Sequence, residues 1–286
     1  MKGQKFFLII ILCLFLSIFW NSTPITAAKD TYYPINGWRT STLEKQGLNA
    51  EPLKNMENVI EESRIAVDSI LIVRNGFLVY EKHFPYYDHA NVHQMFSTTK
   101  SITSILIGIA NNSGFITDLD QSIVEIFPGK SFTNMDDRKR NITIRHLLAM
   151  QCGLRWPEWS THYLLSPVDP QDYEALANYT NPNLDGYSFN PANIVVQMAN
   201  SSDWVQFVLD QPMVTDPGTS FNYNTGASHL LSVILQEKTN MSASQFAKEY
   251  LFGPLNITEY YWWMDPQGYT LGGYGIWLAP EDMAKI

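Results

Sequence analysis

Two short runs of apolar residues near the start of the chain, each ending in charged residues, give the clearest hairpin pattern. The runs cover residues 69–74 and 77–82, and β-branched residues occur in both. Asn75 and Gly76 lie between them and supply the positive φ angles that a two-residue turn requires. The pattern predicts a β-hairpin that opens an antiparallel sheet.

Other segments carry apolar residues at every third or fourth position, which is the spacing of an amphipathic helix. The predicted helices cover residues 51–63, 101–110, 142–150, 203–209, 229–238 and 242–251. Ser242 and Gln245 form a capping box at the start of the last one, and Pro280 begins a helix of at most two turns. The polar stretch 167–199, rich in Asn and Pro, is predicted to be an inserted surface loop. These elements indicate an α+β fold.

An isolated hairpin is only marginally stable, so the predicted sheet looks incomplete. Its apolar face would lack later strands to cover it, leaving exposed or poorly packed the side chains of Ile70, Ile72, Phe77 and Val79. Burial of each such side chain contributes about 1.5–3 kcal/mol. We therefore expect the natural domain to continue beyond Ile286 with further strands, and residues 29–286 alone to aggregate or to bind a hydrophobic dye.

The first residues resemble a secretory signal. Lys2 and Lys5 precede an uncharged run over residues 6–20, and small residues lead up to Ala28. The run is shorter than the ~20 apolar residues of a spanning helix, although a membrane anchor is the alternative. Residues 1–28 are thus predicted to be a signal peptide that directs the chain to the cell envelope or the medium. Membrane contact is expected only if this segment is not cleaved.

Composition and charge narrow the classes of function. The chain is 45% hydrophobic and 16% charged, which is typical of a globular protein. Loss of the two signal lysines would change the net charge from −9 to −11, a surface that repels nucleic acid. Cys13 lies in the predicted signal, so Cys152 stands alone and is expected to be a buried apolar residue without a disulfide.

Ser97 and Lys100 are the first candidates for chemistry. If Ser97 opens a helix, residues three apart share a face, and the lysine amine can reach the serine hydroxyl near the positive helix end. A free lysine is protonated at neutral pH and must be desolvated to accept a proton. Phe96, Ile102 and Ile105 are expected to provide that burial. By itself, the Ser-x-x-Lys pattern is common on solvated helices and therefore weak.

A turn-rich loop over residues 216–226 strengthens the case. It runs into the helix expected at His229 and displays Tyr223 between small polar neighbours, where a phenol could share a proton with Lys100. The alternative is a half-buried aromatic residue that is hydrogen-bonded to its own loop.

Three segments together resemble one family. Residues 94–103, 142–154 and 217–226 are similar, in the same order, to the class C-like branch of the serine β-lactamase and penicillin-binding-protein family, which also contains D-alanyl-D-alanine peptidases, esterases and nylon-oligomer hydrolases. The similarity runs from about Ser69 to Ile286. It implies an antiparallel sheet flanked by helices plus a helical lobe, with acyl transfer at their junction and neither metal nor organic cofactor.

The resemblance also implies roles for single residues. Ser97 would be the acylated nucleophile, Lys100 its base, and Tyr223 would assist proton transfer to the leaving group. The family usually has Tyr-x-Asn where this chain has Tyr223-Asn224-Thr225, so Thr225 occupies a substrate-binding position with a hydroxyl in place of an amide. This is closer to the esterase and nylon-oligomer hydrolase members, and it predicts a small ester or amide substrate, with a cell-wall peptide as another candidate.

One family motif is missing. In the family this third motif, Lys-Thr-Gly or His-x-Gly, lies on a late strand, and neither form occurs before Ile286. By the resemblance, that strand would supply one backbone N–H of the oxyanion hole, and losing such a donor costs about 3–4 kcal/mol of transition-state stabilisation. Two alternatives to an enzyme therefore stay open: a non-catalytic or slowly acylated relative that binds penicillin or peptidoglycan, and a structural fragment whose serine never reacts.

Other candidates are weaker. Trp156 and Trp159 resemble, by position, a loop that overhangs the active site in relatives and are candidates for substrate binding, although they fit a core equally well. His89 and His93 have the spacing of a metal pair but no third ligand, so no metal site is expected.

Overall fold

The computed structural model describes residues 32–63, 67–84, 92–163 and 190–286. The chain divides into two compact units, residues 1–33 and 34–286, and the second holds nearly all of the described residues. The predicted signal peptide lies outside the described residues. None of the helices in the described ranges is both long and apolar enough to span a lipid bilayer.

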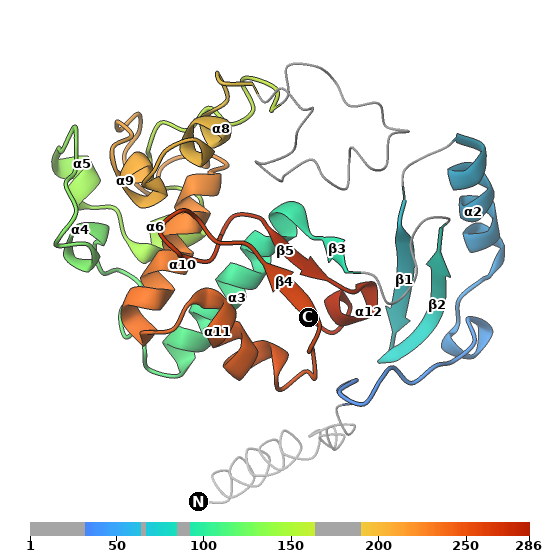
Figure 1. Cartoon of the computed structure of the whole chain (residues 1–286). Helices are drawn as coiled ribbons and strands as arrows, with labels where there is room; N and C mark the ends of the chain where they lie inside the picture. Colours follow the sequence, from blue (N-terminus) through green and yellow to red (C-terminus); the bar gives the residue numbers. More distant parts are fainter. Residues whose placement is uncertain (1–31, 64–66, 85–91, 164–189) are drawn as a thin grey trace, which may run out of the picture. The chain divides into compact units, whose positions relative to one another are not determined.

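The predicted hairpin is confirmed. Strands β1 (Ser69–Arg74) and β2 (Phe77–His83) pair in antiparallel fashion, and Asn75 and Gly76 connect them with φ angles of 51° and 75°. Helix α2 (Glu51–Ser63) also forms as predicted and is tied to β2, because the Tyr80 hydroxyl donates to Glu57 over 2.6 Å. Figure 1 shows α2 beside the two strands.

The hairpin is better covered than the sequence suggested. Residues 39–41 run along the edge of β2 and exchange backbone hydrogen bonds with Leu78, and helix α12 (Pro280–Met283) packs against β1. Val79 is buried, so the expectation of an exposed side chain is wrong there. The other three side chains expected to be exposed are half-buried, namely Ile70, Ile72 and Phe77.

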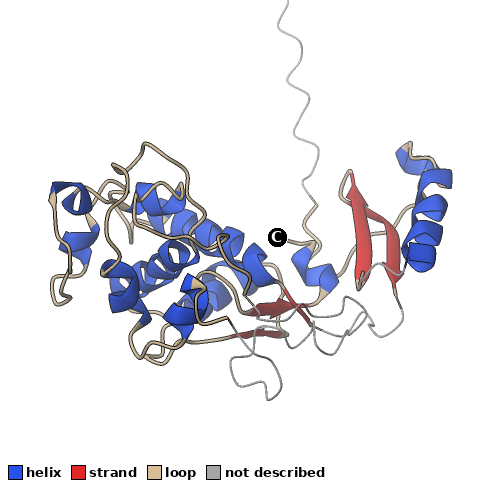
Figure 2. Cartoon of the chain, turned by 90° about the horizontal axis from the view of Figure 1, so that it is seen from above, coloured by secondary structure: helices blue, strands red, loops and turns tan. Residues whose placement is uncertain are grey.

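A second sheet was not predicted. Strands β3 (His93–Gln94), β4 (Tyr260–Trp262) and β5 (Ile276–Leu278) form an antiparallel sheet in the order β3-β5-β4, and Figure 2 shows it separate from the hairpin. These later strands belong to the separate sheet, and within the described residues the hairpin pairs with none of them. These strands have only two or three residues, too few for alternation to reveal them. Their pairing joins the chain just before Ser97 to its C-terminal part.

Helices make up the rest of the described chain. The main ones are α3 (Thr99–Asn112), α6 (Ile144–Leu148), α8 (Ile194–Ala199), α9 (Trp204–Leu209), α10 (Thr225–Thr239) and α11 (Ala243–Ala247). Shorter pieces are η1 (Glu44–Gln46), η2 (Phe96–Thr98), α4 (Ile123–Ile126), α5 (Asp137–Arg140) and η3 (Lys248–Phe252). The capping box of Ser242 and Gln245 starts α11 as predicted.

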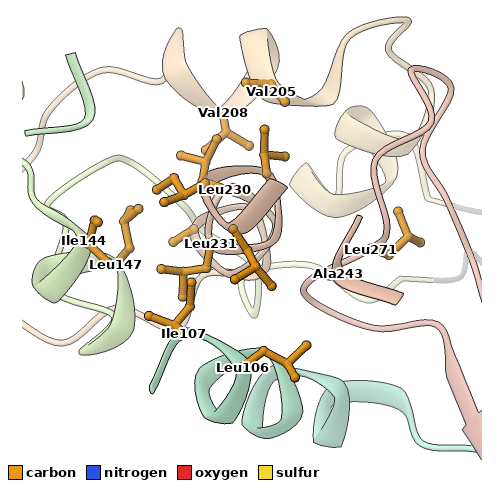
Figure 3. Packing of buried hydrophobic residues seen from close by; sticks show 14 of the residues in the cluster. Leu106, Ile107, Ile144, Leu147, Val205, Val208, Leu230, Leu231, Ala243 and Leu271 are labelled. Carbon is orange, nitrogen blue, oxygen red and sulfur yellow. The ribbon is translucent and has the colours of Figure 1, made fainter. Parts of the chain in front are cut away.

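Helix α10 lies at the centre of the core. It packs against α3, α6, α8, α9 and α11, and Figure 3 shows Leu230 and Leu231 among apolar side chains of α3, α6, α9 and α11. It is buried on all sides from Thr225 to Leu235, as expected of a central helix. The helix starts one turn before the predicted His229, because the Asn224 side chain caps it by accepting from Ala227 N over 2.8 Å.

The loop predicted over residues 167–199 is only partly correct. Residues 194–199 form α8, whose residues Ile194, Val195 and Val196 are buried against the neighbouring helices. Asn193 caps this helix by accepting from Val195 N over 2.9 Å. The polar composition of the stretch concealed a short apolar helix, and residues 167–189 lie outside the described part.

Candidate active site

Ser97 lies on a sharp turn between β3 and α3. The Met95 N–H donates to Ile276 O over 2.8 Å, which fixes the end of β3. Phe96 follows with a φ angle of 43°, a left-handed conformation that is unusual for a bulky residue. The Thr99 hydroxyl holds this turn by donating to Phe96 O over 2.6 Å. Ser97 is thereby exposed on the short turn η2, and α3 begins at Thr99, two residues after Ser97 and two residues before the predicted range 101–110.

The structure brings Lys100 to Ser97. The lysine Nζ lies 3.0 Å from Ser97 Oγ and donates a second hydrogen bond to Gly273 O over 2.6 Å. The side chain is buried, with 9% of the residue exposed. The helical spacing of three residues therefore produces the contact that a serine and its base require.

Burial changes the acidity of this amine. Desolvation lowers the pKa of Lys100 from 10.5 to about 8, while the charge of Glu158 opposes that shift. The expected source of burial is only partly right. Ile102 is fully buried, but Phe96 and Ile105 are 41% and 37% exposed, because they lie on the outer face of the turn and helix.

The rest of the burial of the Lys100 side chain comes from Gly272 and Gly273, which pass between α3 and α10. A Cβ on Gly272 would lie 2.1 Å from Ser228 O, and one on Gly273 would lie 2.7 Å from Thr225 Cγ2. The Thr103 hydroxyl donates to Gly272 O over 2.9 Å and fixes the segment to α3. Glycine is required for this close approach. The Gly-Gly pair was visible in the sequence, but its partner helix was not.

Tyr223 completes the group. It is half-buried just before α10, and its ring centroid lies 4.9 Å from Lys100 Nζ. Burial raises the pKa of the phenol, a hydrogen bond with Ser97 lowers it, and the charge of Glu158 raises it further. The phenol is thus close enough to Ser97 to affect its acidity, and the structure brings together all three residues named for catalysis.

The three candidates for substrate binding lie in different surroundings. Trp159 is 70% exposed, and its ring centroid is 5.6 Å from that of Tyr223, so it flanks the site. Trp156 and Thr225 are buried, and each donates to Glu158. Contact of these three residues with substrate stays a prediction. Of the three, Trp159 has the exposed side chain that such a contact requires.

Glu158 is a residue that the sequence did not single out. It is 2% exposed and its carboxylate accepts hydrogen bonds from Trp156, Tyr163 and Thr225. Its position between two tryptophans was the only local signal, and a glutamate there is usually a solvated surface residue.

No metal group accompanies these residues. Among the described residues, no three His, Cys, Asp or Glu side chains are grouped so as to hold an ion. His93 Nδ1 lies 2.9 Å from Asp68 Oδ2, and His89 lies outside the described residues. Cys152 is buried and free of a disulfide, and burial raises the pKa of its thiol.

The buried lysine predicts a pH-dependent stability difference. Below pH 8, Lys100 is charged in both folded and unfolded chains, and burial of the charge costs up to about 3 kcal/mol. As the pH rises from 8 to 10.5, the folded chain releases the proton first and the cost disappears. Urea unfolding of Lys100→Met and the unchanged protein should therefore show the largest advantage for the variant at pH 7.

That advantage should shrink by up to about 3 kcal/mol by pH 10.5. Groups remote from Lys100 titrate alike in both proteins, so their contributions cancel in the difference. A difference in unfolding free energy that does not change with pH would contradict a buried lysine of lowered pKa.

Known proteins share this arrangement of elements. Residues 53–284 match the sequence model of the family described as Beta-lactamase. Protein flp of Staphylococcus aureus strain MW2 is 23% identical over 250 residues, which are 79% of this chain and 44% of that protein. The chain thus spans less than half the length of this curated relative.

Two solved structures have the same fold. A putative 6-aminohexanoate-dimer hydrolase from Bacillus anthracis aligns with a TM-score of 0.59 and 23% identity, over 80% of this chain and 55% of that one. EstCE1, described as a hydrolase with promiscuous acyltransferase activity, aligns with a TM-score of 0.60 and 15% identity, over 82% and 70%. The α+β architecture predicted from the motifs is confirmed, and the chain belongs to the β-lactamase family, within the superfamily of serine β-lactamases and penicillin-binding proteins.

Proposed function

We propose that this chain is a serine hydrolase that forms an acyl-enzyme on Ser97. The observation that carries the proposal is the 3.0 Å contact between Ser97 Oγ and a buried Lys100 whose pKa is lowered to about 8. At pH 7 about one lysine in ten is then neutral, against fewer than about one in a thousand for an unperturbed amine. The site therefore holds a usable base at neutral pH.

The reaction follows from the positions of the three groups. Neutral Lys100 accepts the Ser97 proton while Oγ attacks the substrate carbonyl, and Tyr223 relays a proton to the leaving alcohol or amine. The acyl group stays on Ser97 Oγ until water, which loses its proton to the same base, attacks the acyl carbon. The bond from that carbon to Oγ then breaks, Lys100 returns the proton to Oγ, and the acid is released. Every proton in this sequence moves among Ser97, Lys100, Tyr223, water and substrate.

The proposal is tested by labelling the purified chain with a fluorophosphonate and mapping the modified peptide by mass spectrometry. We expect one phosphonylated residue, Ser97, because it is exposed and its base is in place. Labelling that is absent, or that is found only on another residue, would refute the serine mechanism.

We propose small esters or amides as the substrate class. Thr225 in place of the usual asparagine supports this assignment, as does the fold shared with EstCE1, a hydrolase. Residues 1–28 support export of the chain, where cell-wall peptides are a further candidate substrate.

The substrate assignment predicts a ranking. Short-chain p-nitrophenyl esters should be cleaved faster than a chromogenic cephalosporin, because no amide side chain at position 225 is present to bind a lactam substituent. The measurement compares kcat/KM for both substrates in one preparation, with the Ser97→Ala variant as blank. A cephalosporin that is hydrolysed faster than every ester would reverse the assignment.

A second candidate function is binding with slow acylation and no turnover. This alternative is compatible with the sequence similarity to Protein flp of Staphylococcus aureus. A stoichiometric burst of p-nitrophenol followed by no steady state would identify this function, whereas continuous release would identify a hydrolase.

A further inference from the structure

Glu158 is a buried carboxylate beside the candidate site, and it accepts a hydrogen bond from each of four donor groups. Its Oε2 accepts from Trp156 Nε1 over 2.7 Å and from Thr225 N over 3.0 Å. Its Oε1 accepts from the Tyr163 hydroxyl over 2.5 Å and from the Thr225 hydroxyl over 2.7 Å. An ionised carboxylate is the one side chain of this size that can accept all four bonds.

These bonds join two parts of the site. Trp156 and Tyr163 belong to the same loop as Trp159, which flanks Tyr223. Thr225 is the first residue of α10 and follows Tyr223 by two positions. Glu158 thus connects the loop that carries Trp159 to the chain that carries the phenol.

The loop is fixed in turn from behind. The Asn193 amide donates to the backbone carbonyls of Glu158 and Thr161, each over 3.0 Å. The carboxylate also meets the N-terminal end of the 15-residue helix α10, where the helix dipole favours a negative charge. Both features stabilise an ionised side chain that would otherwise be costly to bury.

The negative charge of Glu158 acts on Lys100 and Tyr223, two of the three residues proposed for catalysis. Lys100 is surrounded by the Ser97 hydroxyl, the Gly273 carbonyl and the Tyr223 ring, and Glu158 is the carboxylate whose charge acts on it. The same charge contributes to raising the pKa of Tyr223 and of Tyr274, the residue after Gly273. Glu158 therefore opposes, at Lys100, the effect of burial.

We propose that Glu158 is a positioning residue: it holds Tyr223 and the start of α10 in place, and it sets the pH range in which Lys100 acts as a base. This inference rests on the proposed function, since it concerns the same serine, lysine and tyrosine. Glu158 itself touches neither the serine nor the lysine through any hydrogen bond found among the described residues.

The test is the pH dependence of fluorophosphonate labelling in Glu158→Gln. The amide has the same shape, and the hydroxyls of Thr225 and Tyr163 can turn to accept from its NH₂ group, so the fold is kept while the charge is lost. The rise of the labelling rate with pH should move to lower pH by on the order of one unit, because the negative charge that stabilises the lysine cation is gone.

Two variants separate charge from contact. Thr225→Val removes one bond to Glu158 but keeps the charge, so labelling should slow without a shift of the pH curve. Asp137→Asn removes an exposed carboxylate, whose side chain is 97% exposed, and should leave both the rate and the curve unchanged. If Glu158→Gln fails to fold, Glu158→Asp keeps the charge and should label more slowly along the wild-type pH curve.

Each outcome of these measurements either supports or refutes the role proposed for Glu158. A Glu158→Gln curve that rises at the wild-type pH, or a Glu158→Asp curve that is shifted, would overturn the inference. Titration of the Lys100 side-chain signal by NMR in isotope-labelled protein gives a readout that needs no reaction. A wild-type chain that is not labelled on Ser97 refutes the proposed function, and a lysine titration that is lower in Glu158→Gln would still support the role of the charge.

Discussion

Replacing Lys100 with methionine should lower the rate at which Ser97 reacts with a fluorophosphonate by about 10²–10⁴-fold, the usual contribution of a positioned general base. Methionine has a similar volume, but it cannot act as a base and has no N–H to donate to Ser97 Oγ. Serine without its base is a poor nucleophile at neutral pH. The rates should be measured under pseudo-first-order conditions with excess probe.

The matched control is Lys54→Met, which removes an exposed lysine of α2 and should leave the rate unchanged. Ser97→Ala sets the background, because it removes the atom that the probe modifies. A Lys100→Met protein that is folded and labelled at the wild-type rate would rule out Lys100 as the base.

Gly272→Ala should destabilise the chain by about 1–3 kcal/mol or more, the range found when atoms are forced into a filled core. The added methyl group would lie 2.1 Å from Ser228 O, a backbone atom of the buried helix α10 that cannot turn aside. The chain must then move away from α10 and carry the Gly273 carbonyl off Lys100 Nζ. Thermal or urea unfolding, together with the labelling rate, measures both losses.

Gly108→Ala is the matched control, because it adds a methyl group where there is open space. Gly108 lies within α3, and a Cβ there meets no atom within 4 Å. The alanine should stabilise the helix by up to about 1 kcal/mol, because it restricts the unfolded chain and favours helix. If Gly272→Ala were as stable as the unchanged protein, the close passage of residues 272–273 along α10 would be wrong.

Local chemistry predicted much of this fold. The Asn75-Gly76 turn, the capping box at Ser242 and the periodic apolar residues of α2 and α3 each require only neighbouring residues, and each forms as expected. The contact of Ser97 with Lys100 belongs to the same class, since helical geometry fixes it within four residues.

Features that join distant segments could not be predicted in this way. Strand β5 is three residues long and acquires its strand conformation by pairing with β3 and β4. Glu158 becomes important only when Thr225, 67 residues later, reaches it. The burial of Lys100 likewise depends on Gly273 and not on its immediate apolar neighbours.

The separation of 173 residues between Lys100 and its carbonyl partner has a consequence for the newly made chain. A ribosome releases residues 97–112 long before Gly273, so α3 first meets solvent without the segment that later covers its lysine. In that interval the amine is hydrated and keeps the acidity of an ordinary lysine, near 10.4. Non-local contacts of this kind form late in folding. If Ser97 is the nucleophile, as proposed, its reactivity is acquired with the last native contacts, because an emerging chain lacks the buried base that the serine needs.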